Sequence, residues 1–467
     1  MDDRVRDVFV SVLGVPPGIV TPEATPENVP GWDSLAHLSL VAELERVFGV
    51  QLTMDEVLSV GCVGDFAGLV GAGGGGASAA PGESAAGTPG TAAPADPIGP
   101  FLPADRDALF AFADRVSREI TLVHSPEHWD WQYAHNPNVE PGRSPIYLFR
   151  RHGSIAGHLG TIPVVLEAEG KALRASWSAG LVSAPDARAK GAGVRLVERW
   201  TRECDVSLVL GTTPDAEALF TSLGWLRPGG GHLHSYMKLL DADAVVRKRV
   251  SSAAARKVLS SVANVALSLI LRAPSVAGGD LRVRTFDRFD ARFDDFWERV
   301  KGGYRLIVRR DRRYLQWKFA SQPGVEYVKI VAERTGSADG GRDDGAGEGV
   351  AGGGKGAVAG YAVLRIMKRK PYVAYIVDCL AGAEDDEAWR YLVAASVDVL
   401  QSRGVQQIWC VVLNPAAEGH LRRFGFVLRD SPMTFFVRPN REGLDPALFT
   451  EGANWFVTKG DADQDRP

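Results

Sequence analysis

The sequence is poor in the features that mark secreted, membrane-spanning and metal-binding proteins. No apolar run reaches the roughly 18 residues that a membrane-spanning helix needs, and the first residues do not form a signal peptide. The net charge of −4 gives no reason to expect nucleic-acid binding. These absences favour a cytoplasmic protein without a bound metal. The 467 residues contain four cysteines, none at a spacing typical of a metal or redox site: Cys62, Cys204, Cys379 and Cys410.

The first 70 residues stand apart in charge and contain a short motif at a helix start. They hold eleven acidic residues against three arginines, whereas the remainder is mildly basic. Within Gly31-Trp32-Asp33-Ser34-Leu35, a serine follows an aspartate that can cap a helix. A helix with one buried face is predicted after it by the apolar residues Leu35, Leu38, Val41, Leu44 and Phe48.

The stretch Asp33-Ser34-Leu35 resembles the attachment motif of acyl carrier proteins, over about residues 1–70. The resemblance implies an all-α, four-helix carrier domain. It also implies that Ser34 carries a covalent 4'-phosphopantetheine cofactor, attached by a phosphopantetheinyl transferase. Taken alone, an Asp-Ser-Leu tripeptide would by default indicate only a serine that caps a helix, and the length, acidity and downstream helix favour the carrier interpretation.

Low-complexity segments divide the rest of the chain. Residues 71–100 are mostly Gly, Ala, Ser, Pro and Thr, which predicts a flexible linker with a root-mean-square span of about 30 Å. Residues 335–357 predict a disordered loop between two strands that pair with each other. Residues 441–467 are expected to form a C-terminal tail.

The body contains an internal repeat. Trp131-Gln-Tyr-Ala-His-Asn-Pro137 returns as Trp317-Lys-Phe-Ala-Ser-Gln-Pro323, and Leu223-Gly-Trp225 returns as Phe424-Gly-Phe426. Two copies of one α/β unit are therefore predicted over 101–242 and 281–440.

A basic amphipathic helix is predicted between the copies, within residues 243–280. Such a helix can lie on a membrane surface, receive an acidic partner such as the N-terminal region, or simply connect the two copies. Its basic residues are Arg247, Lys248, Arg249, Arg256 and Lys257.

The first copy contains a glycine-rich turn between a strand and a helix. The strand ends at Leu181-Val182, and the turn Arg188-Ala189-Lys190-Gly191-Ala192-Gly193 opens a helix with Val194, Leu196, Val197 and Trp200 on one face. Glycines let backbone amides approach a ligand, and a helix start offers N–H donors with a positive dipole end. This turn suits a pyrophosphate, and Arg188 and Lys190 add positive charge.

The turn resembles the acyl-CoA loop of the GNAT N-acetyltransferase superfamily, and the resemblance covers most of residues 101–440. It implies two GNAT-like domains, each with a mixed, mostly antiparallel twisted sheet flanked by helices. By the same resemblance, Leu181 and Val182 pair with the pantetheine arm of acyl-CoA and direct an N–H at the thioester carbonyl. The cofactor-binding residues implied are Leu181, Val182, Arg188, Ala189, Lys190, Gly191, Ala192 and Gly193.

The sequence departs from the family pattern at the positions where catalytic residues are expected. Phe220 stands where the family often has a proton-donating tyrosine, and Thr213 stands where an asparagine is common. The general base is open, since each histidine can also be a structural side chain. The candidates for catalysis are His158, Thr213, His232 and Tyr236.

The second copy departs from the pattern. Its corresponding turn, Ala381 to Glu387, lacks a Gly-x-Gly pair and has four carboxylates, which would repel a pyrophosphate. It is therefore predicted to be a degenerate scaffold.

Together these features predict an acyltransferase that moves an acyl group from acyl-CoA to an amine, in specialised metabolite or lipid biosynthesis. The carrier domain holds a substrate or product, so the acceptor is a small or carrier-tethered amine, and biosynthetic enzymes are expected partners. One alternative is S-acyl loading of the carrier thiol. Another is a non-catalytic scaffold that presents the carrier to other enzymes.

Overall fold

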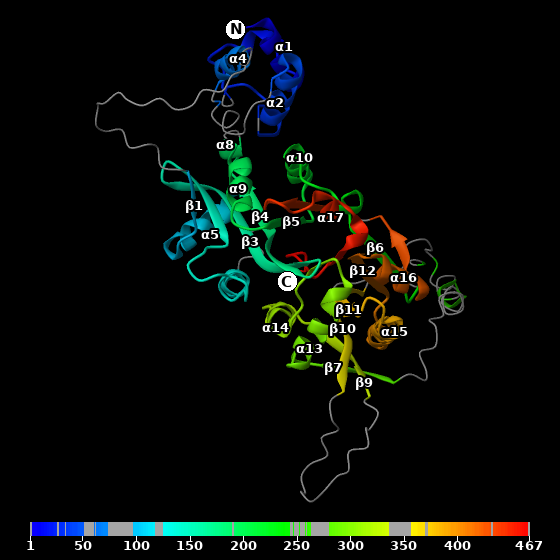
Figure 1. The fold of residues 1–467 in the computed structure, drawn as a ribbon. Coiled ribbons are helices and arrows are strands. Elements are labelled where there is room, and N and C mark those ends of the chain that lie inside the picture. Colours follow the sequence, from blue (N-terminus) through cyan, green and yellow to red (C-terminus); the bar gives the residue numbers. More distant parts are fainter. Residues whose placement is uncertain are drawn as a thin grey trace, which may run out of the picture.

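The computed structural model describes residues 2–25, 28–32, 34–50, 60, 62–72, 97–116, 125–188, 191–242, 246, 252, 257, 259–262, 280–335, 356–368, 372–430 and 433–465. Figure 1 shows a small helical region next to a larger body of strands and helices. The predicted fold class, a helical region followed by a mixed α/β body, is confirmed. No helix among the described residues is both long and apolar enough to cross a membrane.

The N-terminal region comprises α1 (Asp3–Leu13), α2 (Ser34–Phe48) and α4 (Val63–Ala72). Residues 51–59 lie outside the described residues, so three of the four predicted helices are described. Asp2 caps α1 by accepting a hydrogen bond from the Arg4 amide, and the left-handed Gly14 ends the helix. The core is built on three aromatic rings. The Phe9 ring meets the rings of Trp32 and Phe66 edge-on, with ring centroids 4.9 and 5.6 Å apart.

The ends of α1 and α2 show which way α2 runs. The Arg4 guanidinium lies over the Phe48 ring at 4.4 Å, so the start of α1 meets the end of α2. At the opposite end, the Leu13 carbonyl lies beside Gly31. The two helices are therefore antiparallel, and the Ser34 end of α2 lies far from the N-terminus.

The first half of the body, residues 97–242, forms a sheet with helices on both faces. Alternate residues of β2 belong to two clusters, with Ile146 and Leu148 packing with α5 and Tyr147 and Phe149 packing with α9. Its elements are β1 (Ile98–Pro100), α5 (Arg106–Val116), α7 (Pro126–Trp129), β2 (Ile146–Arg151), β3 (Ser154–Ala168), β4 (Lys171–Ser183), α8 (Pro185–Arg188), α9 (Ala192–Thr201), β5 (Val206–Leu210), α10 (Pro214–Ser222) and β6 (His234–Leu239).

The second half, residues 280–465, shares part of this order, namely three successive strands followed by a helical segment, a strand and a helix. As predicted, β9 and β10 pair across the long loop, most of which lies outside the described residues. Its elements are β7 (Leu281–Phe286), α13 (Arg292–Val300), β8 (Leu306–Val308), α14 (Arg312–Ala320), β9 (Val328–Arg334), β10 (Ala357–Ile366), β11 (Val373–Ala381), α15 (Asp386–Ser402), β12 (Gln407–Leu413), α16 (Pro415–Arg423), β13 (Val427–Arg429), β14 (Phe435–Pro439), α17 (Pro446–Thr450) and β15 (Trp455–Thr458).

The two halves exchange strands. β6, from the first half, pairs with β12 of the second, and β14, from the second half, pairs with β5 of the first. β15 bridges the halves by pairing with both β8 and β12, and β8 in turn pairs with β3. The described strands therefore form one continuous sheet. The division into two copies at residues 242 and 281 stays a prediction from the sequence.

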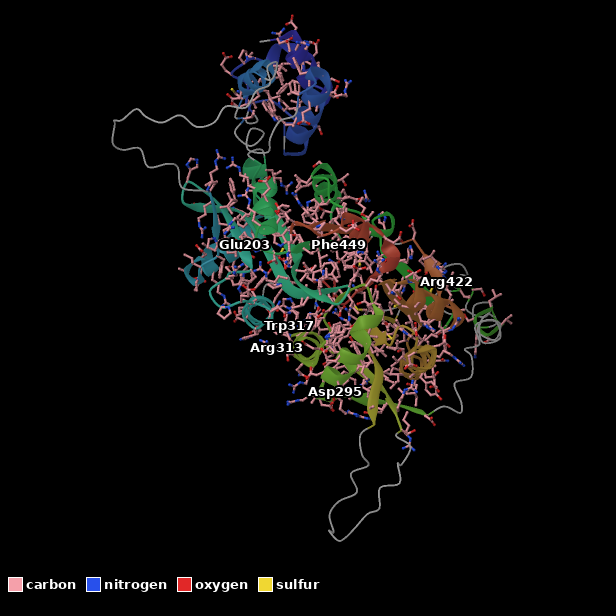
Figure 2. The ribbon with its side chains drawn as sticks, in the orientation of Figure 1. Glu203, Asp295, Arg313, Trp317, Arg422 and Phe449 are labelled. Atoms are coloured by element: carbon pink, nitrogen blue, oxygen red, sulfur yellow. The ribbon has the colours of Figure 1, made fainter. Side chains whose placement is uncertain are left out.

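The repeated tryptophans meet at the junction of the two halves. Trp131 and Trp317 stack with ring centroids 4.8 Å apart, and each indole N–H donates to the backbone carbonyl of the other at 2.8 Å. Figure 2 labels Trp317 near the middle of the body. This reciprocal contact relates the two repeats by an approximate twofold, as in an isologous interface.

The prediction of a tail over 441–467 was wrong, because its described residues contain α17 and β15 and enter the core. Asp461 is 1% exposed and bonds the buried Arg310 guanidinium at 2.7 Å. Arg310 also pairs with Asp378, and Asp465 pairs with Arg365. Buried charges require such partners, so these acidic residues are held inside rather than solvated.

The predicted linker is shorter than 71–100 at both ends. α4 continues to Ala72, and Ile98–Pro100 forms β1, which pairs with β2. Residues 73–96 lie outside the described residues, as do Arg247, Lys248, Arg249 and Arg256 of the predicted basic helix.

Candidate functional site

The strands β4 and β5 separate in the first half. They pair in parallel from Ala175 with Val206 to Trp177 with Leu208. β4 continues to Ser183, yet among the described strands its later residues pair only with β3. The outer edge of β4 beyond Trp177 is therefore open to another extended chain. We call this opening the first splay.

A β-bulge shapes the open end of β4. The register with β3 shifts between His158 and Gly160, and Gly180 adopts a left-handed φ of 77°. The His158 Nδ1 lies 2.8 Å from the Gly180 carbonyl oxygen. Because a carbonyl can only accept, Nδ1 carries the proton. His158 is 2% exposed, and burial lowers its pKa to about 4, so the ring is neutral near pH 7.

Tyr133 supports this bulge, and sequence reasoning missed it. A Cβ at Gly160 would clash with the Tyr133 hydroxyl and with the Ala179 carbonyl oxygen. Only a glycine therefore lets Tyr133 approach β3 beside the bulge. The signal was present in the Trp131–Pro137 repeat, whose third residue is Tyr133.

The predicted glycine turn leads into α9 beside the first splay. Gly191, which precedes α9, is left-handed with a φ of 69° and has no side chain with which to cap the helix. The first amides of α9 are therefore available to a ligand. The predicted apolar face is confirmed, since Val194, Leu196, Val197 and Trp200 are all buried. Ala192 and Gly193 open the helix, whereas Ala189 and Lys190 lie outside the described residues.

Arg188 lies across the mouth of the first splay. Its Nε donates to the Ser183 carbonyl at 3.3 Å, and its guanidinium lies 3.8 Å from Asp215 of α10. Both side chains are more than half exposed. Such an exposed pair is weak, so Arg188 can turn towards an anionic ligand.

The far end of β5 gathers groups that are distant in the sequence. Thr213 caps α10 by accepting from the Ala216 amide. The neighbouring Thr212 hydroxyl lies 2.6 Å from that of Thr434, and Gln464 donates to the Leu210 carbonyl at 2.7 Å. His232 pairs with Thr434 and so lies on the far side of the β14 chain from β5. Sequence reasoning could not place Thr434 and Gln464 here, since only long-range pairing brings them to β5.

Tyr236 lies elsewhere. It is fully buried on β6, within the sheet of the second half. Its hydroxyl donates to Glu418 of α16 at 2.8 Å and accepts from Arg422 at 2.7 Å. Burial and the Glu418 carboxylate raise the Tyr236 pKa to about 12. The structure therefore does not bring Tyr236 together with His158 at the first splay. Figure 2 labels Arg422 in the second half.

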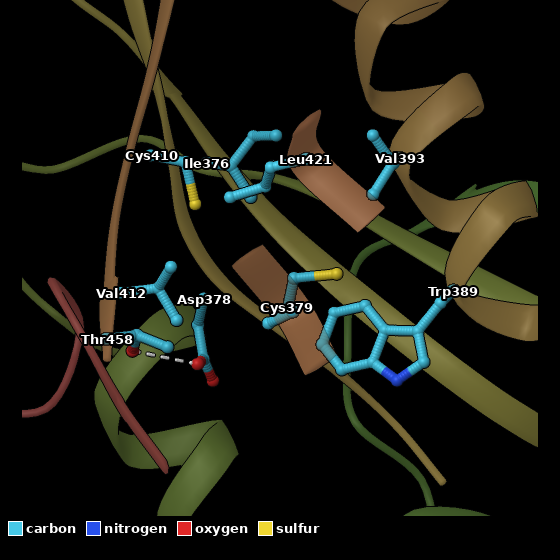
Figure 3. Close-up of a pocket in the computed structure, with 10 residues that line it drawn as sticks. Ile376, Asp378, Cys379, Trp389, Val393, Cys410, Val412, Leu421 and Thr458 are labelled. Carbon is cyan, nitrogen blue, oxygen red and sulfur yellow. Dashed lines mark hydrogen bonds between the residues drawn. The ribbon is translucent and has the colours of Figure 1, made fainter. Parts of the chain in front are cut away.

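The corresponding opening in the second half, which we call the second splay, is filled. β11 and β12 pair only as far as Ile376 with Cys410, and β15 then pairs with Val412 and Leu413. The Gly460 amide donates to the Val377 carbonyl at 3.0 Å, beside the bulge of β11. Figure 3 shows Thr458 of β15 bonded to Asp378 among these residues. The void that remains is about 20 Å³, room for one water molecule.

The helix starts of the two halves also differ. Asp385 caps α15 by accepting from the Ala388 amide at 3.0 Å, whereas the corresponding residue before α9 is Gly191, which has no side chain. Arg334 forms ion pairs with Asp385 and Glu387, which hold these two carboxylates at the start of α15. An anion is therefore favoured at α9 and disfavoured at α15.

A larger surface hollow lies at the other end of α9. It has a volume of about 310 Å³ and is lined by residues that include Arg143, Arg174 and Glu203. These charges pair with one another and with Glu140. Cys204 lies here, and burial raises the pKa of its thiol, which does not favour a nucleophile.

The N-terminal region contacts the body beside the first splay. α2 lies against α9 and α10, and Figure 1 shows α8 and α10 at the edge of the body that faces it. The Ser34 end of α2 is the end nearer the body, because the N-terminus marks the far end of the antiparallel pair. Asp33 lies outside the described residues.

Residues 3–70 match the family model described as a phosphopantetheine attachment site, which confirms the carrier-type region predicted around Ser34. The chain is also similar to a GCN5-related N-acetyltransferase from Anabaena variabilis, with 11% identity, a TM-score of 0.47, and coverage of 74% of this chain and 72% of that one.

Two further solved structures are similar. A probable N-acyltransferase from Enterococcus faecalis has 10% identity and a TM-score of 0.48, over 73% of this chain and 72% of that one. Saccharomyces cerevisiae N-myristoyltransferase with bound myristoyl-CoA has 13% identity and a TM-score of 0.42, over 74% of this chain and 83% of that one. At such scores the similarity is too distant to assign an activity.

Proposed function

We propose that this protein is an acyltransferase that moves an acyl group from an acyl-CoA thioester to an amine at the first splay. The observation that carries the proposal is the open edge of β4 beside the glycine-led start of α9, next to α2 of the carrier region. Specialised metabolite or lipid biosynthesis is the setting that we infer from the fused carrier.

The residues divide into three roles. Arg188 and the amides at Gly191 to Gly193 bind phosphate, since helix starts and arginines favour anions. The edge of β4 at Leu181 and Val182 pairs with the amides of pantetheine, as a peptide adds to an open strand. His158 and Tyr133 hold the bulge in place.

In the reaction, the amine nitrogen attacks the thioester carbonyl carbon, so a C–N bond forms and the C–S bond breaks. An N–H from the bulged strand stabilises the oxyanion of the tetrahedral intermediate. The thiolate leaves with the electron pair and takes up a proton, while the amine loses one. His232, which lies across the β14 chain from the end of β5, is our candidate proton acceptor through water, because His158 is buried and Tyr236 lies in the other half.

The test is release of free CoA thiol and formation of an amide from decanoyl-CoA and a panel of primary amines. We expect both products with the full chain, and loss of both in the variant Gly191→Glu/Gly193→Glu. A chain that binds decanoyl-CoA without forming any amide would favour the scaffold alternative instead. Decanoyl transfer to the Ser34 arm alone would favour S-acyl loading.

A further inference from the structure

We infer that the phosphopantetheine arm on Ser34 enters the first splay and serves there as an acyl donor, so that the acyl-carrier and acyl-CoA occupy one site in turn. This inference rests on the proposed function and specifies what the carrier holds. Because the arm and acyl-CoA use the same splay, the arm cannot present the amine there while acyl-CoA is bound.

The first argument is the position of the carrier. The Ser34 end of α2 faces the body, and α2 contacts α9 and α10, the two helices that border the first splay. The basic helix predicted within residues 243–280, which is the other candidate receiving surface, lies largely outside the described residues. An arm that leaves Ser34 therefore meets the mouth formed by Arg188 and Gly191.

The second argument is the chemistry along the path. The arm begins with a phosphate, which suits the exposed guanidinium of Arg188 and the amides at the start of α9. The contact of Arg188 with Asp215 is exposed and therefore weak, so it can be exchanged for a contact with the phosphate. The two amides of the arm then match the open edge of β4, where Gly180 to Ser183 span about 10 Å at 3.3 Å per residue. The thiol end reaches the bulge.

The third argument is that the second splay is closed to the arm. β15 and Gly460 occupy its strand edges, and Asp385 occupies the helix start. Of the two splays in the described residues, only the first has both an open edge and an adjacent carrier. The acyl group on the arm can thus meet the amine at Gly180 to Val182.

The transfer balances without another reactant. An acyl thioester on the arm and an amine give an amide and a free thiol on the arm. The carbonyl carbon exchanges its C–S bond for a C–N bond, and the proton lost by the amine balances the one gained by the thiolate. A separate loading reaction must acylate the arm thiol again before the next turnover.

Disulfide trapping in the full chain tests the entry of the arm. The chain carries Cys62→Ser, is converted to the phosphopantetheinylated form, and contains either Leu181→Cys at the first splay or Val427→Cys, which is 48% exposed on β13 of the second half. Oxidation with diamide removes two hydrogens when the arm thiol joins the introduced cysteine. Peptide mass mapping then identifies the linked residues.

We expect a link between the Ser34 arm and residue 181 to form at least about tenfold faster than a link to residue 427, because a tethered arm has a high effective concentration only where it can reach. Ser34→Ala should form neither link, and excess acetyl-CoA should slow the 181 link. Equal rates at the two positions, or no 181 link in a chain shown by mass to carry the arm, would overturn the inference. A 181 link unaffected by acetyl-CoA would support arm entry and contradict acyl-CoA binding in the proposed function.

Discussion

At the scale of single residues, the site depends on one backbone distortion. Gly180 gives β4 a left-handed residue, and the Nδ1–H of His158 holds its carbonyl. Sequence reasoning selected His158 as a proton acceptor, yet its burial suits it better to holding the strand. A histidine in an apolar stretch carries no mark that separates these roles, because burial depends on the packed neighbours.

The change Gly180→Ala tests whether the bulge matters for transfer. Alanine at a φ of 77° is strained, and its Cβ would lie 3.7 Å from the His158 ring, so we expect a loss of about 1 kcal/mol in stability and at least tenfold in turnover. Gly170→Ala is the matched control, since Gly170 has a φ of 78° and nothing within 4 Å. Denaturant unfolding and amide formation measure the two effects, and equal turnover losses in both variants would contradict a role for the bulge.

The buried His158 also predicts a pH dependence of stability. Its pKa falls from 6.5 to about 4 on folding, so between these pH values the unfolded chain binds the proton more tightly. Stability present at pH 7 is therefore lost as the pH falls from 6.5 towards 4, by up to about 3 kcal/mol. His158→Gln can still donate to Gly180 and does not titrate, so its unfolding free energy should vary less over this range. An unchanged pH slope in denaturant titrations would contradict the buried neutral ring.

At the scale of elements, strands from distant parts of the chain make the halves unequal. β15 closes the second splay, and β14 completes the sheet beside β5 without closing the first. The sequence predicted that the second copy is degenerate from its carboxylates, which do cap and surround α15. It did not predict the filling strand, because pairing between β15 and β12 is not local.

We therefore expect one CoA site per chain. Calorimetry should give a stoichiometry near one, and Gly191→Glu/Gly193→Glu should abolish binding by clash and charge repulsion. The control is Gly302→Glu/Gly419→Glu in the second half, where nothing lies within 4 Å of an added Cβ. Two sites per chain, or unchanged affinity in the first variant, would contradict the assignment of the first splay.

At the scale of the whole molecule, the sequence predicted the carrier-type region and the α/β class, because each has a local signal such as Ser34 or helical periodicity. It misread residues 441–467 as a tail. Asp461 and Asp465 resemble solvated charges until their partners, the buried Arg310 and the half-buried Arg365, are known. The exchange of β6 and β14 likewise has no local signal, since either strand fits either sheet.

The most direct test of the account is a single-turnover experiment on the full chain with an acyl group loaded on the Ser34 arm. Mass spectrometry follows loss of the acyl group from the arm and its appearance in an amide after addition of a primary amine. We predict amide formation in the wild-type chain and a loss of at least about a hundredfold in rate for Gly191→Glu/Gly193→Glu, with Gly302→Glu/Gly419→Glu unaffected. An acyl arm that the amine never discharges, or that discharges equally fast in the first variant, would contradict acyl transfer at the first splay.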